Sequence, residues 1–218
     1  MKPAGSRRFT IGILNAQEPV VLPVIAQYVA QHAPSIDIAA GQHDRRAIET
    51  DLLTGSLDAV IDVLLPHPQS VRSTRLSTDR YVVLCRRDHP RVGQRLDLDA
   101  YLAEEHVLVT SRQRGGGVED AALVRLGAER RVRLRCVRYF AACRVVNQTD
   151  LLLTMPERYA RLLNEMCGNR MLECPFDASI DTYLYWHANA DADPANGWLR
   201  RQPGDIFDPV RADTTSHP

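Results

Sequence analysis

The first 63 residues alternate between strand-like and helix-like segments, and this order restricts the possible folds more than any other feature. Three apolar, β-branched runs predict strands at residues 9–14, 35–39 and 57–63. Two segments with apolar side chains at helical spacing predict helices at 20–32 and 46–54. Pro19 suits a helix start and Gly55 a helix end. This order requires parallel strands joined by right-handed crossovers, which predicts an α/β lobe.

The alternation of strands and helices is interrupted at residues 81–85, where an apolar run predicts a strand. Charged residues and His89-Pro90 follow, and the residue before a proline disfavours a helix. The alternation then resumes. Further strands are predicted at residues 106–110, 131–139, 150–154 and 171–175, and helices at 96–102, 118–126, 140–147 and 155–166. Residues 180–187 are rich in aromatic and β-branched types and predict a strand that returns to the first lobe. The fold class is therefore α/β, with two Rossmann-like lobes joined by two crossover strands, as in the type 2 periplasmic-binding-protein fold.

These elements predict the domain boundaries. Lobe I is expected at residues 9–80 and 187–207, lobe II at 88–179, and the hinge strands at 81–87 and 180–186. A last helix is expected within 197–201 and a frayed tail from residue 208. A small molecule is expected in the cleft between the lobes.

Charge and hydropathy exclude several classes of protein. The net charge is zero, so the chain has no overall basic field for nucleic acid or an anionic membrane. No apolar run resembles a signal peptide or a membrane span, which predicts a cytoplasmic protein without a membrane partner. Five cysteines without Cys-x-x-Cys spacing are expected to be reduced and mostly buried.

Motifs for metal binding and catalysis are missing from the sequence. The histidines form no His-x-x-x-His or His-Glu-x-x-His pattern, so neither a metal nor another cofactor is predicted, and His187 is expected to be a packed core histidine. There is no Gly-x-Ser-x-Gly elbow, and isolated acids such as Asp62 and Glu18 have no evident partner. No catalytic residue is predicted.

Two loops follow predicted strands, at the edge where parallel sheets bind ligands. The turn containing Asn15, Gln17 and Glu18 follows the first strand, although these residues could simply cap the next helix. Gly115 and Gly116, after Arg112 and Arg114, open onto a predicted helix. Free backbone N–H groups beside a guanidinium can bind a carboxylate, although a flexible surface loop is the plainer interpretation.

Aromatic residues supply further candidates. Tyr139 and Phe140 follow an alternating strand, and a ring with a hydroxyl suits a flat heteroaromatic molecule. Tyr183 and Tyr185 share one face of the return strand, so one could close the pocket while the other packs in the core. The exposed arginine stripe at residues 131, 133 and 135 is expected to be a solvated sheet face rather than a nucleic-acid surface.

Several motifs resemble the effector-binding domain of LysR-type transcriptional regulators, in the branch of nodulation and aromatic-catabolism regulators. They are RFTIG at 8–12, GSLD at 55–58, YVVLCRRDHP at 81–90, TDLLLTMPER at 149–158, WH at 186–187, DP at 193–194 and WLR at 198–200. The resemblance spans residues 8–200. Toxoflavin-responsive regulators belong to the same neighbourhood. Gly116 stands where some relatives carry a side chain that binds their ligand, so a salicylate preference does not transfer directly.

The resemblance implies a ligand-sensing domain that binds a planar aromatic or heteroaromatic effector and transmits its presence to transcription control. The expected effector contacts lie at strand ends: Asn15, Gln17, Glu18, Asp62, Thr110, Ser111, Arg112, Gly115, Gly116, Tyr139, Phe140 and Tyr185. It also implies a homodimer, a tetramer for the full-length regulator, and DNA contact only through an N-terminal domain that this sequence does not contain. A free-standing solute-binding protein and an enzyme of the same fold are the alternatives.

Overall fold

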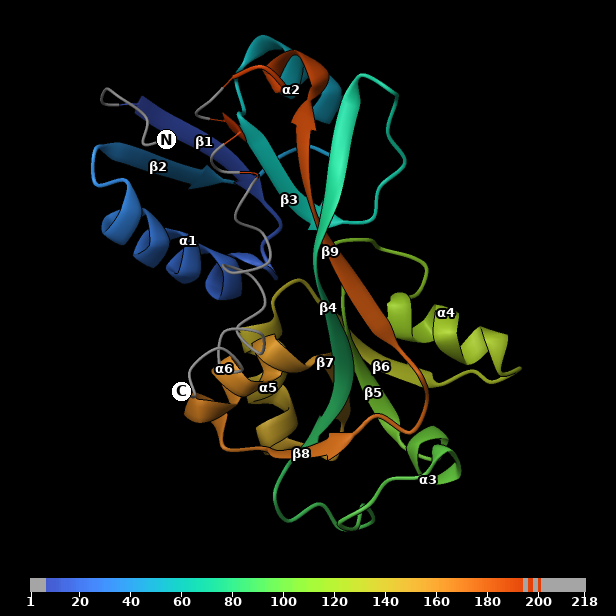
Figure 1. Ribbon diagram of the computed structural model, residues 1–218. Helices are drawn as coiled ribbons and strands as arrows, with labels where there is room; N and C mark the ends of the chain where they lie inside the picture. Colours follow the sequence, from blue (N-terminus) through green and yellow to red (C-terminus); the bar gives the residue numbers. More distant parts are fainter. Residues whose placement is uncertain (1–6, 194–195, 198–199, 201–218) are drawn as a thin grey trace, which may run out of the picture. The chain divides into compact units, whose positions relative to one another are not determined.

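The computed structural model describes residues 7–193, 196–197 and 200, and it divides the chain into two compact units. Unit 1 comprises Met1–Thr78 and Asp181–Pro218, and unit 2 comprises Asp79–Ile180. The chain passes from unit 1 to unit 2 within strand β4 (Val71–Cys85) and returns within strand β9 (Ser179–His187). These two strands are hydrogen-bonded neighbours (Figure 1).

Unit 1 is built on the predicted strand-helix-strand-helix-strand sequence. Its elements are β1 (Arg7–Ile13), α1 (Glu18–His32), β2 (Ile36–Gly41), α2 (Ile48–Thr54) and β3 (Ala59–Val63). β1 pairs in parallel with both β2 and β3, and β9 is antiparallel to β3. Apolar side chains of α1 and β1 share one core, whereas α2 packs with Val60 and Tyr185 in another. The two helices therefore cover opposite faces of this sheet.

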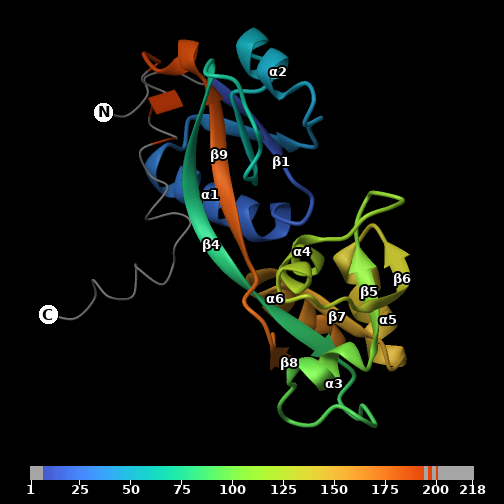
Figure 2. The ribbon, with the colours of Figure 1, turned by 90° about the vertical axis from the view of Figure 1, so that its right-hand side faces the viewer.

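Unit 2 repeats this arrangement. Its elements are α3 (Leu98–Leu102), β5 (Glu105–Val109), α4 (Val118–Arg125), β6 (Arg131–Cys136), α5 (Tyr139–Gln148), β7 (Leu152–Pro156), α6 (Glu157–Cys167) and β8 (Arg170–Glu173). β5 is parallel to β6 and β7, and β4 lies between β7 and β8. Alternate residues of β4 enter two cores, one with α3 and α4 and one with α5 and α6. α4 and α5 thus lie on opposite faces (Figure 2).

The predicted α/β class is confirmed, and most predicted boundaries lie within two residues of the observed ones. β4 is the main exception, because it begins at Val71 and not at residue 81. Its first ten residues are mostly polar and only partly buried, so they lack the apolar run that marks residues 81–85. A short 3-10 turn at Ala188–Ala190 follows β9.

Two segments were assigned the wrong element. Met155 was predicted to start a helix, but it pairs with Val82 in β7, and α6 begins only after Pro156. Its side chain is fully buried, so the apolar run of β7 simply continues through it. Tyr139 was assigned to the strand before it, but it is the first residue of α5.

Other predictions concern the cysteines, His187 and the end of the chain. All five cysteines are free thiols, and Cys85, Cys143 and Cys167 are buried, as predicted. His187 is buried and its Nδ1 accepts a hydrogen bond from the Asn189 N–H, which confirms its structural role. Of the predicted last helix, Gly197 and Arg200 are helical, whereas residues 198, 199 and 201 and the predicted tail from 208 lie outside the described residues.

Candidate functional site

The carboxyl ends of β1, β2 and β3 gather polar side chains at one edge of the unit 1 sheet, because these strands are parallel. Asn15 is exposed in the turn after β1, and Glu18 is the first, half-buried residue of α1. The Gln17 amide donates to the Thr182 hydroxyl at 2.8 Å, which ties this turn to β9. None of the three caps α1 through its side chain, since the N-cap residue Gln17 makes no such bond.

Asp62, near the end of β3, is fully buried and accepts hydrogen bonds at both carboxylate oxygens. Arg45 reaches it with two nitrogens, Nε at 2.7 Å from Oδ2 and Nη2 at 2.6 Å from Oδ1. His43 Nε2 lies 2.9 Å from Oδ2, and the Val63 N–H donates to Oδ1 at 2.7 Å. Burial alone would raise the pKa of Asp62, but the bonds from His43 and Arg45 lower it below its ordinary value.

This cluster holds a guanidinium in a fixed orientation. The Arg45 side chain is 40% exposed, and its Nη1 makes no hydrogen bond within the described part of the chain. His43 is almost fully buried, and its Nδ1 also lacks a partner among the described residues. A buried carboxylate that orients an accessible arginine is suited to presenting hydrogen-bond donors to an electron-rich ligand atom.

Gly12 of β1 makes room for His43, and a substitution there tests this packing. A Cβ atom at Gly12 would lie 2.9 Å from the His43 Cβ and 3.1 Å from Leu57 Cδ1. We expect Gly12→Ala to lower the free energy of unfolding by about 1–3 kcal/mol, the usual cost of overpacking. Gly41→Ala is the matched control, because no atom lies within 4 Å of that Cβ. Equal effects of the two substitutions in urea denaturation would contradict this account of Gly12.

Tyr185 lies in the core of unit 1, fully buried. Its hydroxyl donates to the Val63 carbonyl and accepts from the Leu65 N–H, both at 2.8 Å. Of the two tyrosines on this face of β9, Tyr185 therefore packs inside and braces the chain after β3. Tyr183, which is half-buried, is the better placed of the two to contact a ligand.

In unit 2, the loop after β5 carries five predicted contacts. Thr110 Oγ1 accepts the Arg112 N–H at 3.1 Å, while Ser111 and Arg112 are exposed. Gly115 has a left-handed backbone (φ 90°), and its carbonyl accepts a hydrogen bond from Arg135 at 2.7 Å. Since glycine adopts this conformation at little cost, Gly115 shapes the loop before α4.

The next two glycines are required by close packing. A Cβ at Gly116 would lie 2.5 Å from the Cβ of Asp120, and one at Gly117 would collide with the Glu119 carboxylate. The Gly117 N–H donates to Asp120 Oδ2 at 2.5 Å. The sequence left open whether this glycine loop binds a ligand carboxylate or is a flexible surface loop. At the start of α4, the Gly117 N–H is already bonded to a carboxylate of the chain itself.

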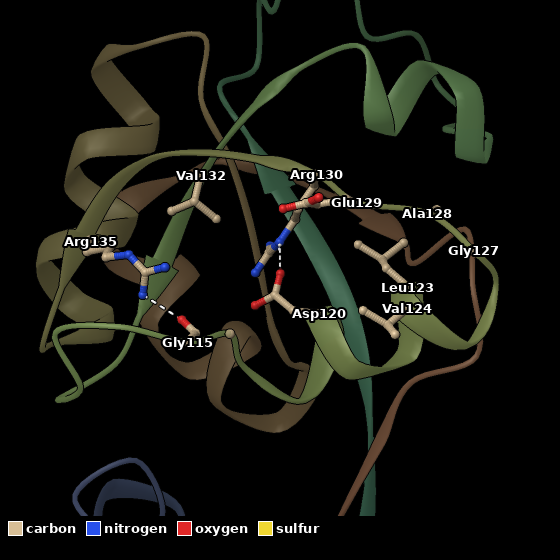
Figure 3. A pocket seen from close by; sticks show the side chains of 11 residues that line it. Gly115, Asp120, Leu123, Val124, Gly127, Ala128, Glu129, Arg130, Val132 and Arg135 are labelled. Atoms are coloured by element: carbon tan, nitrogen blue, oxygen red, sulfur yellow. Dashed lines mark hydrogen bonds and ion pairs between the residues drawn. The ribbon is translucent and has the colours of Figure 1, made fainter.

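Arg130 holds this loop in place through its bonds to the first turn of α4 (Figure 3), and its side chain is only 1% exposed. Nε donates to Asp120 at 2.6 Å and Nη2 to Glu119 at 2.8 Å, whereas Nη1 lies 3.2 Å from the Tyr101 hydroxyl. That hydroxyl also bonds Thr154 at 2.8 Å. Arg130 thus joins α3, α4 and β7 into one buried network beneath the loop.

Tyr139 and Phe140 begin α5, at the carboxyl end of β6. Tyr139 is half-buried, and its ring meets that of Tyr159 edge-to-face at 5.4 Å. Burial raises the pKa of Tyr139 above its ordinary value, with a further contribution from Glu119, so the phenol stays neutral. Its hydroxyl has no hydrogen bond among the described residues. Phe140 is 47% exposed, a large apolar surface for a single residue.

The predicted contacts therefore form two groups. Asn15, Gln17, Glu18, Asp62 and Tyr185 belong to unit 1, and Thr110, Ser111, Arg112, Gly115, Gly116, Tyr139 and Phe140 belong to unit 2. Sequence reasoning missed His43, Arg45 and Arg130. His43 and Arg45 follow β2, so the strand-end rule used for Asn15 could have found them. For Arg130 the only signal was the acidic first turn of α4, Glu119-Asp120.

Two classes of feature are missing from the described residues. No three His, Cys, Asp or Glu side chains among them are grouped to hold a metal ion. None of the described helices has the length and apolar character that crossing a membrane requires.

Comparisons with known proteins agree with this architecture. A family model described as the LysR substrate binding domain matches residues 4–203. The transcriptional activator NagR from Ralstonia is 30% identical over 94% of this chain and 68% of its own length. NahR from Pseudomonas putida, also a transcriptional activator, is 32% identical over 92% of this chain and 67% of its own.

A solved structure of a transcriptional regulator from Pseudomonas aeruginosa has a TM-score of 0.82 and 29% identity, covering 94% of this chain and 68% of that one. Two α/β units joined by two strands are the architecture described above, and the family match assigns this architecture to a regulator's ligand-binding domain. The chain belongs to the LysR substrate binding domain family. This confirms the resemblance to the aromatic-catabolism and nodulation branch. Regulators of this family bind small-molecule effectors and DNA and act as oligomers, and these relatives are named as regulators, not enzymes.

Proposed function

We propose that this effector-binding domain recognises a small planar aromatic or heteroaromatic molecule through side chains at the carboxyl ends of its parallel strands. The observation that carries this proposal is the pairing of Tyr139 with Tyr159 at such a strand end, with the Tyr139 hydroxyl lacking a hydrogen bond among the described residues. A flat ring can stack or pack edge-to-face there, and its polar substituent can pair with the hydroxyl. At the strand ends of unit 1, Arg45, oriented by Asp62, presents hydrogen-bond donors that suit a polar substituent.

The effector acts by favouring one arrangement of the domain. A ligand shifts a conformational equilibrium only by the difference between its affinities for the two states. The two crossings in β4 and β9 are the connections at which such a change would occur. We further propose that the domain forms a homodimer, with α1 of one chain against unit 2 of its partner, in the cytoplasm. Sedimentation analysis of the domain tests the dimer, and a monomer at all concentrations would contradict it.

Variants at Tyr139 test the site directly. Calorimetric titration with a compound that stabilises the domain should show about fivefold weaker binding for Tyr139→Phe, since one hydrogen bond contributes about 1 kcal/mol. Tyr139→Ala should bind still more weakly because it also loses the ring. Thr54→Val, which deletes an exposed hydroxyl at the end of α2, is the matched control and should retain the wild-type affinity. Folded Tyr139 variants with unchanged affinity would refute the site.

A further inference from the structure

The side-chain bonds of β4 change partners at the point where the chain enters unit 2. On this strand unit 1 ends at Thr78, and unit 2 begins at Asp79. The Thr78 hydroxyl donates to Asp181 at 2.5 Å, and Asp181 is the residue at which β9 returns to unit 1. Asp79 instead accepts a hydrogen bond from the Arg158 N–H of unit 2, at 3.1 Å. Two neighbouring residues of one strand are thus bonded within different units.

The first turn of α6 is held by β4. Its own N-cap residue, Pro156, makes no side-chain cap bond, so the N–H groups of this turn need acceptors from elsewhere. Asp79 supplies one acceptor, at the positive end of the helix dipole. The next residue of β4, Arg80, forms an ion pair with Glu157, the first residue of α6. Two consecutive residues of β4 therefore bond two consecutive residues of α6, which fixes the position of this turn.

The same turn carries Tyr159, whose ring meets that of Tyr139 edge-to-face at 5.4 Å. Tyr159 directly follows Arg158, the residue whose N–H is bonded to Asp79. Both rings pack against the core that β7, α5 and α6 share. Since Tyr139 is on α5 and Tyr159 on α6, the geometry of the pair depends on where the first turn of α6 lies.

We propose that Asp79 is a positioning residue for the effector contact at Tyr139. By holding the first turn of α6, Asp79 keeps the Tyr159 ring against Tyr139, and it does so from the strand by which the chain enters unit 2. The aromatic pair and this crossing are therefore coupled through one helical turn, and the coupling acts in both directions, because linked equilibria are reciprocal. The inference rests on the proposed function only in that it takes Tyr139 as an effector contact.

NMR spectroscopy of the intact chain tests the positioning role without a ligand. Asp79→Ala should raise the hydrogen-exchange rate of the Arg158 amide about fivefold or more, the effect of losing a helix-capping bond. It should also weaken the nuclear Overhauser effect between the Tyr139 and Tyr159 rings. Asp79→Asn should restore both, because the asparagine oxygen accepts the same bond. Burial raises the pKa of Asp79, so an uncharged side chain suits this position.

Asp97→Ala is the matched control. Asp97 caps α3 of the same unit by accepting the Ala100 N–H at 2.8 Å, so this variant loses an equivalent bond elsewhere in unit 2. It should raise the exchange rate of the Ala100 amide and leave the Arg158 amide and the two rings as in the wild type. A control variant that disturbs the rings as much as Asp79→Ala does would show general loosening and contradict a specific role for Asp79.

A substitution at the other end of the coupling separates it from simple helix capping. Tyr139→Leu, on α5, removes neither partner of the bond between Asp79 and the Arg158 N–H. It should nevertheless raise the exchange rate of the Arg158 amide about twofold or more, because the aromatic pair in turn holds the first turn of α6. Unchanged exchange in this variant, or intact ring contact in Asp79→Ala, would overturn the proposal. Neither result measures ligand affinity, which calorimetric titration of the Tyr139 variants reports separately, so failure of this inference and failure of the proposed function are distinguishable.

Discussion

Replacing Arg130 with methionine is expected to lower the free energy of unfolding by about 3–5 kcal/mol, because it leaves buried acids without their counter-charge. Glu119 and Asp120 both bond this guanidinium, at 2.8 and 2.6 Å. Burial already raises the pKa of Glu119, so its charged form depends on Arg130. Urea denaturation followed by circular dichroism measures the loss.

The next residue along the chain provides the control. Arg131 has the same side chain, but it is 70% exposed and pairs with Glu105 at the surface. Arg131→Met should cost no more than about 1 kcal/mol, the usual range for an exposed ion pair. Similar losses in the two variants would show that the Arg130 network does not hold unit 2 together.

The second large effect concerns pH. His106 is fully buried, and burial, with a contribution from Arg130, lowers its pKa to about 4. An unfolded histidine takes up its proton near 6.5, so between pH 6.5 and 4 the unfolded state binds more protons than the native state. Stability due to His106 is complete above 6.5 and decreases as the pH falls through this window, by up to about 3 kcal/mol.

The variant His106→Gln isolates this contribution. Glutamine can still donate to the Tyr101 carbonyl, which His106 Nε2 contacts at 2.9 Å, but it does not titrate. The raised pKa values of Glu119 and Asp79, both due mainly to burial, act in the opposite direction. The informative quantity is therefore the difference in unfolding free energy between wild type and His106→Gln, measured from pH 7 to 4. It should shrink as the pH falls, and a difference that stays constant over this range would contradict the prediction.

The fold could be predicted where the burial of a segment shows in its sequence as a pattern of apolar residues. Residues 81–85 are all buried, between β7 and β8, so the run is apolar throughout and reads as a strand. The preceding ten residues of β4 lie in the same strand, but only Val71 and Leu76 among them are buried, and the rest are polar and partly or fully exposed. Their extended conformation depends on neighbouring strands distant in sequence, which no local pattern reveals.

The site could be predicted only in part, for a related reason. Asp62 was recognised as a candidate but had no evident partner, because His43 and Arg45 lie 17–19 residues earlier on the loop after β2. Arg130 and Arg131 are adjacent and chemically identical, yet one is 1% and the other 70% exposed. Only the fold decides which of them lies beneath α4. Strand-end positions identify loops that face ligands, but not which side chains hold one another in place.

The most direct test of the effector-binding role is thermal denaturation of the domain with a panel of aromatic and heteroaromatic compounds. A ligand that binds only the native state raises its stability by mass action, by about 2.7 kcal/mol at a concentration 100 times its Kd. We predict that at least one compound raises the melting temperature in a concentration-dependent way and is recovered chemically unchanged. A panel in which no compound stabilises the domain, or one in which the stabilising compound is converted to a product, would contradict the account.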